Sequence, residues 1–316
     1  MLQNKIEGVQ PFNAFHYKSC YYHQLIAGLA CFNIDSDNIF MNSFVEIKED
    51  FLTEKKEILN EKEHQKFFGY KKVKCNITKR KLIKFINKGE PIIVGVDCYC
   101  LKNRKDTYML KHAPHYILLY GYDFVNNKLN IIDHCYENSS VYDERIVCSE
   151  DILWANKMFK KNFAKDNKTC HVLKKKKKKE YENLVLWKTL SREKWIDNHN
   201  NSLKNLEELM TLFLSDFQKL EEKSGKIEKY LQDLKCWMSI LSEIKNFFND
   251  LKIREKFLLL HNAYSNFSSY FFIMKAKNNY NCKGKMLDSI VRKIDEMIIL
   301  ENDIYQIIMR LSGDEI

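Results

Sequence analysis

Cys20 is a residue whose type and position suit nucleophilic catalysis. It directly precedes residues 21–32, in which leucine and phenylalanine recur at helical spacing. Cys20 therefore lies at the N-terminus of a predicted helix. A helix N-terminus carries partial positive charge and free backbone N–H groups, which lower the pKa of a thiol and hold an oxyanion. Cys20 is therefore a candidate thiolate nucleophile.

A histidine and an aspartate farther along the chain supply the other two groups that this chemistry needs. His115 begins one apolar run rich in β-branched and aromatic residues, and Asp133 ends the next such run. A thiolate nucleophile needs an imidazole that shares its proton and a carboxylate or amide that orients the ring. Each residue alone is commonly structural, whereas the three in this order predict a catalytic triad of Cys20, His115 and Asp133.

The two apolar runs are predicted to form a hairpin of Tyr116–Phe124 with Lys128–Asp133. Asn126-Asn127 is the predicted tight turn, because asparagine tolerates positive φ. In that register Asp133 lies opposite Tyr120 rather than His115. Strand twist or a short bend is then needed to bring the carboxylate to the imidazole.

The other segments of the first half predict a sheet preceded by helices. Ile92–Asp97 is typical of a short buried strand, and Lys79–Asn87, closed by Gly89, has helical spacing. Together with the helix after Cys20 and the hairpin, they predict an α+β catalytic domain over residues 1–155.

The second half of the chain has the composition of long helices. The last proline is Pro114, so the final 202 residues contain none, and glycine is rare after residue 121. Proline and glycine are the residues that helix interiors tolerate worst, and apolar residues recur there every three or four positions. We expect an antiparallel bundle of about four helices over residues 183–316, broken near Gly225 and Gly284.

The basic excess of the chain is local. The formal charge is +10, with 52 Lys and Arg against 42 Asp and Glu, and 14 against 6 of these fall within residues 151–200. Lys174–Lys179 is an unbroken run that predicts a solvated basic linker over residues 156–182, or a docking patch for an acidic partner. Because both folded halves are nearly neutral, we expect no nucleic-acid partner.

Composition and cysteine spacing bound the class of protein. With 45% hydrophobic and 13% aromatic residues, the chain is predicted to fold around a sizeable core. The 10 cysteines include no Cys-x-x-Cys, and Cys98 and Cys100 would point to opposite faces of a strand, so neither a disulfide framework nor a metal site is expected. Without a signal peptide or a membrane-spanning run, we expect a cytoplasmic protein with reduced thiols.

Several segments of the first half resemble those of a known family. They are Gly89-Glu-Pro-Ile-Ile-Val-Gly-Val-Asp97 with Tyr99, His115 to Asp123, and Lys128 to Asp133. With Cys20 at a helix start, they resemble the papain-like cysteine-peptidase fold over roughly residues 10–155. The closest similarity is to the branch that holds bacteriocin-leader peptidases and the butirosin-biosynthesis acyltransferase.

This resemblance implies roles for particular residues. It makes Cys20 the nucleophile, His115 the acid/base and Asp133 the orienting residue. The family also places an oxyanion-hole Gln or Asn a few residues before the cysteine. The candidates for this role here are Asn13, which is preferred, and His16. A proline often follows the family's aspartate, whereas here His134 does, so His134 or His112 competes for a catalytic role.

The resemblance also implies a reaction. We expect an acyltransferase that moves an acyl group from a carrier-protein phosphopantetheine thioester through Cys20 onto a small amine or diamine. No metal, ATP or cofactor of its own is expected. The arrangement of a catalytic domain followed by a helical domain resembles that of the acyltransferase group. Within that group, the chain resembles most the amide-forming enzymes of closthioamide-type nonribosomal pathways.

Three other functions remain open at the level of sequence. The first is a cysteine peptidase that uses the same nucleophile. The second is a non-catalytic protein that holds a small molecule in a cleft near Asp97, Tyr99 and His115. The third is nucleic-acid binding, which the charge distribution disfavours. The adjacent pairs Phe247-Phe248 and Phe271-Phe272 cannot both face one helical seam, so we expect part of the bundle to contact the catalytic domain or a second copy in a homodimer.

Overall fold

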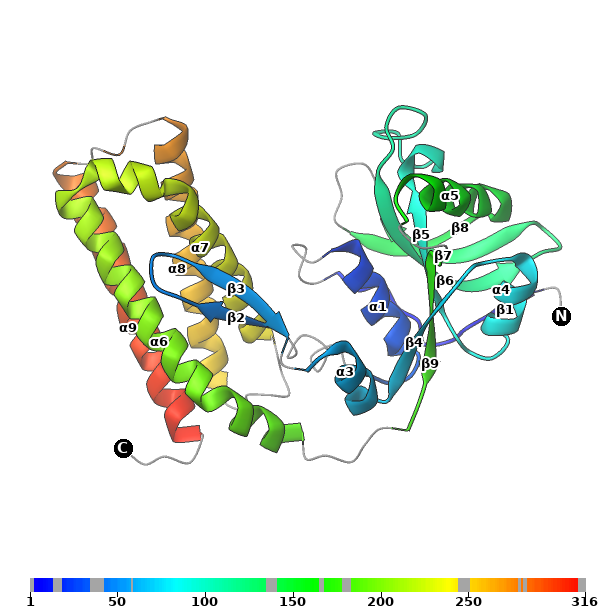
Figure 1. The fold of residues 1–316 in the computed structure, drawn as a ribbon, viewed down its shortest axis with the longest axis horizontal. Coiled ribbons are helices and arrows are strands. Elements are labelled where there is room, and N and C mark those ends of the chain that lie inside the picture. The colour runs from blue at the N-terminus through cyan, green and yellow to red at the C-terminus, as the bar shows by residue number, and fades with distance from the viewer. Residues whose placement is uncertain are drawn as a thin grey trace. The chain divides into compact units, whose positions relative to one another are not determined.

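The structure is a computed structural model that describes residues 3–13, 19–34, 43–57, 59–134, 141–164, 168–177, 183–243, 251–277, 280 and 283–311. It divides into two compact units (Figure 1). The sheet unit comprises Met1–Ile39 and Leu59–Glu180, and the bundle unit comprises Phe40–Ile58 and Tyr181–Ile316. The predicted α+β class is confirmed, since one unit is built on an antiparallel sheet and the other on helices.

The sheet unit is organised around an antiparallel sheet. In the described residues its strands follow the order β4-β9-β5-β6-β7-β8, and β1 pairs with the far end of β6. Hydrophobic side chains of the central strands are almost fully buried and form the core of this unit. The strand bounds are β1 Gln3–Lys5, β4 Tyr70–Cys75, β5 Ile92–Asp97, β6 Pro114–Asp123, β7 Lys128–His134, β8 Tyr142–Cys148 and β9 Cys170–Lys175.

Helices cover this sheet. Helix α1, Cys20–Ala30, is buried at every residue from His23 to Leu29, and a Cβ on Gly28 would lie 2.6 Å from Leu173 and 3.1 Å from Leu118. This glycine lets the helix approach β6 and β9 closely. The other helices of the sheet unit are α3 Glu61–Phe68, α4 Lys79–Ile86, α5 Ser149–Asn162 and the 3-10 turn η1 Cys98–Cys100.

The elements predicted in the first half agree with the structure to within about two residues, but the predicted linker does not. Residues 156–182 were expected to be linker, whereas α5 extends to Asn162 and β9 occupies Cys170–Lys175. Strand β9 lies between β4 and β5, so its pairing partners are distant in sequence. Local pattern carries no signal for such pairing.

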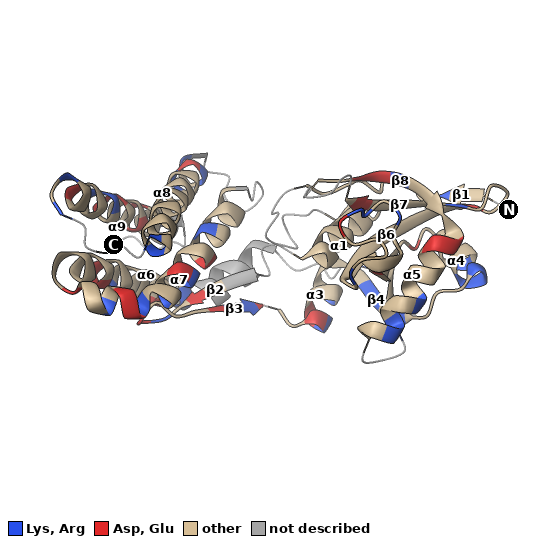
Figure 2. Ribbon diagram, turned by 90° about the horizontal axis from the view of Figure 1, so that it is seen from above, with Lys and Arg blue, Asp and Glu red and all other residues tan. Residues whose placement is uncertain are grey.

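The lysine run begins inside this strand. Lys174 lies opposite Lys71 of β4, and its Nζ forms an ion pair with Glu90 Oε2 at 3.3 Å. Lys176 and Lys177 follow the strand and are exposed, while Lys178 and Lys179 lie outside the described residues. Figure 2 shows Lys and Arg residues gathered along β4 and α4 of the sheet unit. The run is therefore part of a basic surface on folded strands as well as an extension beyond them.

Among its described residues the bundle unit has four long helices, in line with the predicted number: α6 Asn183–Ser215, α7 Phe217–Glu243, α8 Leu251–Ala276 and α9 Lys285–Leu311. Gly284 directly precedes α9 with a φ of 57°, at the predicted break. The predicted break at Gly225 is wrong, because α7 continues through this residue. The break lies instead at Asp216, between the end of α6 and the start of α7, where Asp216 Oδ1 accepts a hydrogen bond from Lys219 N at 3.0 Å. One glycine in an exposed helix interior costs only ~1 kcal/mol, which the packing of α7 outweighs.

Of the residues expected to make adjacent apolar pairs, Phe271 is fully buried in the bundle core and Phe272 is exposed. Phe247 and Phe248 lie outside the described residues. Among the described helices, none has both the length and the apolarity to cross a bilayer.

A hairpin from the first half of the chain belongs to the bundle unit, which sequence analysis did not predict. Its strands are β2, Ser43–Ile47, and β3, Thr53–Glu57. Three asparagines of α6 bind its backbone. Asn198 accepts from Ile47 N at 2.9 Å and donates to Val45 O at 2.6 Å. Asn205 accepts from Phe51 N at 3.2 Å and donates to Lys48 O at 2.8 Å, and Asn201 donates to Ile47 O at 2.9 Å.

We expect Asn205→Ala to destabilise the chain. The substitution leaves the buried Phe51 N–H and the Lys48 carbonyl without the side chain that pairs with them, at a cost of about 1–3 kcal/mol per group. Urea unfolding of the full chain, followed by far-UV circular dichroism, measures the loss. Asn200→Ala, on the exposed side of the same helix, is the matched control and should leave the midpoint unchanged. Equal midpoints for the two variants would contradict the hairpin attachment.

Candidate active site

Cys20 is the first residue of α1, with Ser19 as its N-cap. The cap residue is extended, at φ −63° and ψ 153°, and its side chain makes no capping hydrogen bond. The thiol is half-buried, and the His115 side chain and the backbone N–H groups of Tyr116 and Tyr21 are the groups that lower its pKa. The helix N-terminus and the start of β6 thus meet at one sulfur atom.

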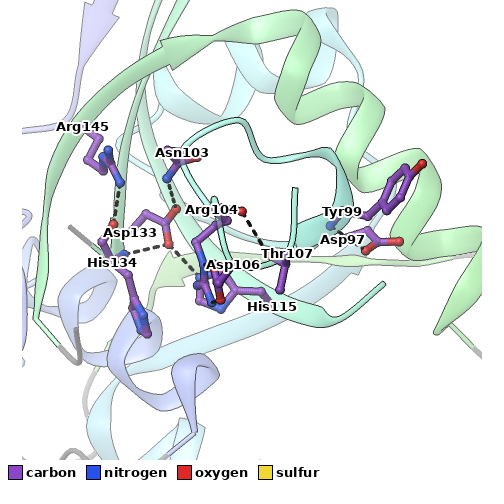
Figure 3. A network of polar contacts seen from close by, with 10 residues as sticks. All are labelled: Asp97, Tyr99, Asn103, Arg104, Asp106, Thr107, His115, Asp133, His134 and Arg145. Atoms are coloured by element: carbon purple, nitrogen blue, oxygen red, sulfur yellow. Dashed lines mark hydrogen bonds and ion pairs between the residues drawn. The ribbon is translucent and has the colours of Figure 1, made fainter. Parts of the chain in front are cut away.

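His115 and Asp133 form a buried ion pair at the ends of two neighbouring strands (Figure 3). His115 Nε2 lies 2.7 Å from Asp133 Oδ1, and the residues are only 4% and 1% exposed. Since Nε2 faces the carboxylate, Nδ1 is the ring nitrogen left for Cys20. Asp133 Oδ1 also accepts from His134 N at 2.8 Å. The structure therefore brings together all three residues of the predicted triad.

A β-bulge aligns this pair. The turn occupies 124–127, with Asp123 opposite Lys128, so the predicted register was wrong. Leu119 lies opposite Ile131 and Gly121 opposite Asn130, which leaves Tyr120 as an extra residue on β6. Such a residue reverses the alternation of side chains beyond it.

The consequence falls on Asp133. Without the extra residue Asp133 would lie opposite Leu118, on the other sheet face from His115. With it, the register continues from Leu118 opposite Ile132 and places Asp133 beside Ile117, on the same face as His115. A Cβ on Gly121 would lie 2.7 Å from Asn130 Oδ1, so glycine permits the close approach at this irregularity.

Charges in the site favour a thiolate and an imidazolium. Burial raises the pKa of the Cys20 thiol, but His115 and the N–H groups of Tyr116 and Tyr21 outweigh it and hold that pKa below its usual range. Burial lowers the pKa of His115, but Asp133 and Cys20 outweigh it and raise that pKa to about 9. Although burial opposes ionisation of Asp133, His115 keeps the pKa of that carboxyl low. All three charges are therefore mutually stabilised.

His134 packs against the triad without joining it. Its ring meets the His115 ring edge-on at 5.2 Å, and its carbonyl accepts from Arg145 Nη1 at 2.6 Å. Burial and the His115 charge lower the pKa of His134 to about 4, so this ring is neutral at physiological pH. A neutral ring there leaves His115 as the charged imidazole of the site.

The residues predicted to line a substrate cleft, Asp97 and Tyr99, have structural contacts of their own. Asp97 is fully buried, and its carboxylate accepts from His112 Nδ1 at 2.7 Å, Asn162 Nδ2 at 2.9 Å and two backbone N–H groups. Tyr99 stacks on His112 at 4.4 Å. Figure 3 shows Asp97 and Tyr99 apart from Asp133. This cluster anchors the loop that leads into β6, and it places His112 outside the triad.

Asn13, the preferred oxyanion candidate, has a different partner. Its Oδ1 accepts from Tyr142 N at 2.6 Å, and its Nδ2 donates to Tyr142 O at 2.9 Å. Both ends of the amide are bound to the backbone of β8, which does not support the oxyanion role. The other candidate, His16, lies outside the described residues.

Sequence analysis missed two aromatic residues beside the triad. His23, one turn into α1, stacks on Tyr142 at 4.7 Å with an interplanar angle of 19°. Tyr142 meets His134 edge-on at 4.3 Å, and His134 in turn contacts His115. His23 had a detectable signal in its spacing from Cys20, whereas Tyr142 reaches the site only through the pairing of β8 with β7.

The described residues also bear on the metal site and the disulfides considered from the sequence. Within the described part of the chain, no cluster of three or more His, Cys, Asp or Glu side chains has the arrangement of a metal site. The described cysteines, Cys98 and Cys100 included, are free thiols. The chemistry that the described residues present is therefore that of a thiolate paired with an imidazolium.

Comparison with known proteins adds no functional assignment. No protein-family model matches the chain, and a search of curated proteins found no match to its sequence.

We expect His115→Asn to slow the alkylation of Cys20 by iodoacetamide at pH 7 by about tenfold or more. Loss of the imidazolium leaves burial as the dominant influence, so the Cys20 pKa rises, and each unit of rise above the working pH removes about nine-tenths of the thiolate. Peptide mass spectrometry of timed samples across pH 5–10 measures the rate and its midpoint.

Cys31 is the internal control for this experiment. Burial raises its pKa to about 12, so it should remain unmodified in both folded proteins. The same Cys20 rate and midpoint in the wild-type chain and His115→Asn would refute the ion pair.

Proposed function

We propose that this chain is a cysteine-dependent acyltransferase that forms an amide from a thioester and an amine. The observation that carries the proposal is the Cys20–His115–Asp133 arrangement, in which a helix N-terminus and two strand ends hold a thiolate, an imidazolium and a carboxylate. This set of groups suits attack on an acyl carbon and protonation of its leaving group.

The architecture of the sheet unit supports a papain-like fold as part of the proposal. The nucleophile opens a buried helix, and the imidazole and carboxylate come from adjacent antiparallel strands packed beside it. The segments that resemble the papain-like family, from Gly89 to Asp97 and from His115 to Asp133, coincide with β5, β6 and β7.

The proposed reaction has two balanced steps. The Cys20 thiolate attacks the thioester carbonyl carbon, and the departing pantetheine thiolate takes the proton of His115. The amine then attacks the acyl-enzyme while neutral His115 accepts its proton, and the Cys20 thiolate leaves. Thioester exchange is nearly isoenergetic and amide formation is downhill, so the energy of the donor thioester suffices for the transfer.

A basic surface near the nucleophile supports a carrier protein as donor. Tyr21, next to Cys20, packs against His171 of β9 at 5.3 Å, and Lys72 Nζ of β4 lies 5.4 Å from its ring. Lys71, Lys72 and Lys74 belong to β4, along which Figure 2 shows Lys and Arg residues, and Lys174 and Lys175 belong to β9. An acidic carrier bound to β4 and β9 would bring its pantetheine arm to the side of α1 where Cys20 lies.

We expect a small donor, S-acetyl-N-acetylcysteamine, to acetylate Cys20, with a mass gain that corresponds to one acetyl group. A diamine should discharge this adduct at least about tenfold faster than water does, because the proposed acceptor is an amine. Intact-mass spectrometry follows both steps. Cys20→Ala is the control and should show no gain. Faster discharge by water, together with cleavage of peptides, would replace the proposal with a cysteine peptidase.

We expect replacement of the exposed residues Lys71, Lys176 and Lys177 by serine to raise the KM for a carrier-bound donor by roughly three- to tenfold, because favourable charge contacts with an acidic carrier are lost. The KM for S-acetyl-N-acetylcysteamine should not change. Lys219→Ser with Lys229→Ser, on exposed positions of the bundle, is the control. Equal effects on both donors would remove the docking role from β4 and β9.

A further inference from the structure

Tyr142 connects the element that carries the nucleophile with the strand that carries the carboxylate. Its ring stacks on His23 of α1, three residues after Cys20, at 4.7 Å. The other contact of the ring is the edge of His134 at 4.3 Å, and β7–β8 pairing places Tyr142 opposite His134. Tyr142 is 4% exposed and is therefore buried next to these two rings.

The backbone of Tyr142 is bound by the side chain of Asn13 as well as paired with His134 of β7. Asn13 makes two hydrogen bonds to it, at 2.6 Å and 2.9 Å, in the manner of a neighbouring strand. His23 is fixed in turn, because its Nδ1 bonds to Ser19 O at 3.1 Å beside the N-terminus of α1. Both the stack and the backbone hold the ring in one orientation, as a preorganised donor requires.

The Tyr142 hydroxyl forms no hydrogen bond with another residue of the described ranges, and the residue is 4% exposed. Burial raises the pKa of the phenol, and Cys20 is the charged neighbour that raises it most, followed by Asp133. The phenol therefore stays protonated, as a hydrogen-bond donor, in the neighbourhood of the reactive sulfur.

The sheet unit has a second tyrosine, Tyr21, whose buried hydroxyl lacks a hydrogen-bond partner in the described residues. Apart from burial, the charges that raise its pKa are those of Glu61 and the tyrosines 70, 116 and 22, not that of Cys20. Cys20 is thus a main charged neighbour of the Tyr142 phenol and not one of the main charged neighbours of the Tyr21 phenol.

We propose that Tyr142 is the oxyanion donor of this site, its phenol O–H hydrogen-bonding the acyl oxygen while Cys20 is bonded to the acyl carbon. The inference rests on the proposed acyl-transfer function. The sequence suggested Asn13 for this role, whereas in the structure Asn13 binds the backbone of Tyr142.

The step requires no net proton transfer to or from Tyr142. As the Cys20 sulfur bonds to the carbonyl carbon, the π electrons of the carbonyl move onto its oxygen, and the phenol donates a hydrogen bond to that charge. When the oxyanion collapses, the carbonyl re-forms and the bond to the departing thiolate breaks. The thiolate takes the proton of His115, and the phenol ends as it began.

The test compares two reactions of Cys20 in the wild-type chain and in Tyr142→Phe. Acylation by S-acetyl-N-acetylcysteamine builds an oxyanion, whereas alkylation by iodoacetamide displaces iodide without one. Because the ring and its stack remain, we expect acylation to slow by about a hundredfold, the typical effect of losing one oxyanion donor, while alkylation stays within about twofold. Quenched-flow intact-mass spectrometry measures both rates.

Tyr122→Phe is the matched control, because it removes a hydroxyl from the same sheet that is bonded instead to Asn87 Oδ1 at 2.9 Å. Its two rates should match those of the wild-type chain. Unchanged acylation in Tyr142→Phe, or an equal fall in acylation and alkylation, overturns the assignment. Failure of wild-type Cys20 to form any acyl adduct while iodoacetamide still modifies it overturns the proposed function itself, and is seen before any Tyr142 variant is examined.

Discussion

The ion pair of His115 with Asp133 is the interaction on which the site depends. Burial by itself would strip the charge from an imidazole and from a carboxyl, and removing either partner would leave an isolated buried charge. Here the two charges support each other at 2.7 Å, and the imidazolium in turn favours the thiolate of Cys20. The Cys20 thiolate is therefore favoured by charges that extend from a strand end to a helix N-terminus.

That ion pair exists because of one extra residue in β6. Tyr120 lies in a bulge, and its presence shifts the register so that Asp133 faces the same side of the sheet as His115. Polar residues nearby hold the surrounding backbone. Asp97 binds the loop before β6, and Asn13 binds Tyr142 at the start of β8. Residues that resemble catalytic groups in type thus act as the framework that positions the reacting ones.

The aromatic wall of His23, Tyr142 and His134 extends this framework along one side of the triad residues. Its members come from α1, β8 and β7, so it forms only when the helix packs on the sheet. The neutral His134 and the protonated Tyr142 phenol add polarity without adding charge.

The sequence by itself determined the local elements and singled out Cys20, His115 and Asp133, which the structure brings together. Strand β5, the hairpin strands, helix α1 and the four bundle helices follow from periodicity, turn residues and the absence of proline, which act over a few neighbouring positions. Tertiary structure decided the rest. The β9 pairing, the attachment of the hairpin to α6 and the ring contacts of Tyr142 join residues far apart in the chain. The bulge at Tyr120 depends on which partners β6 finds. Register and long-range pairing are set by packing of the whole sheet, so no local pattern specifies them.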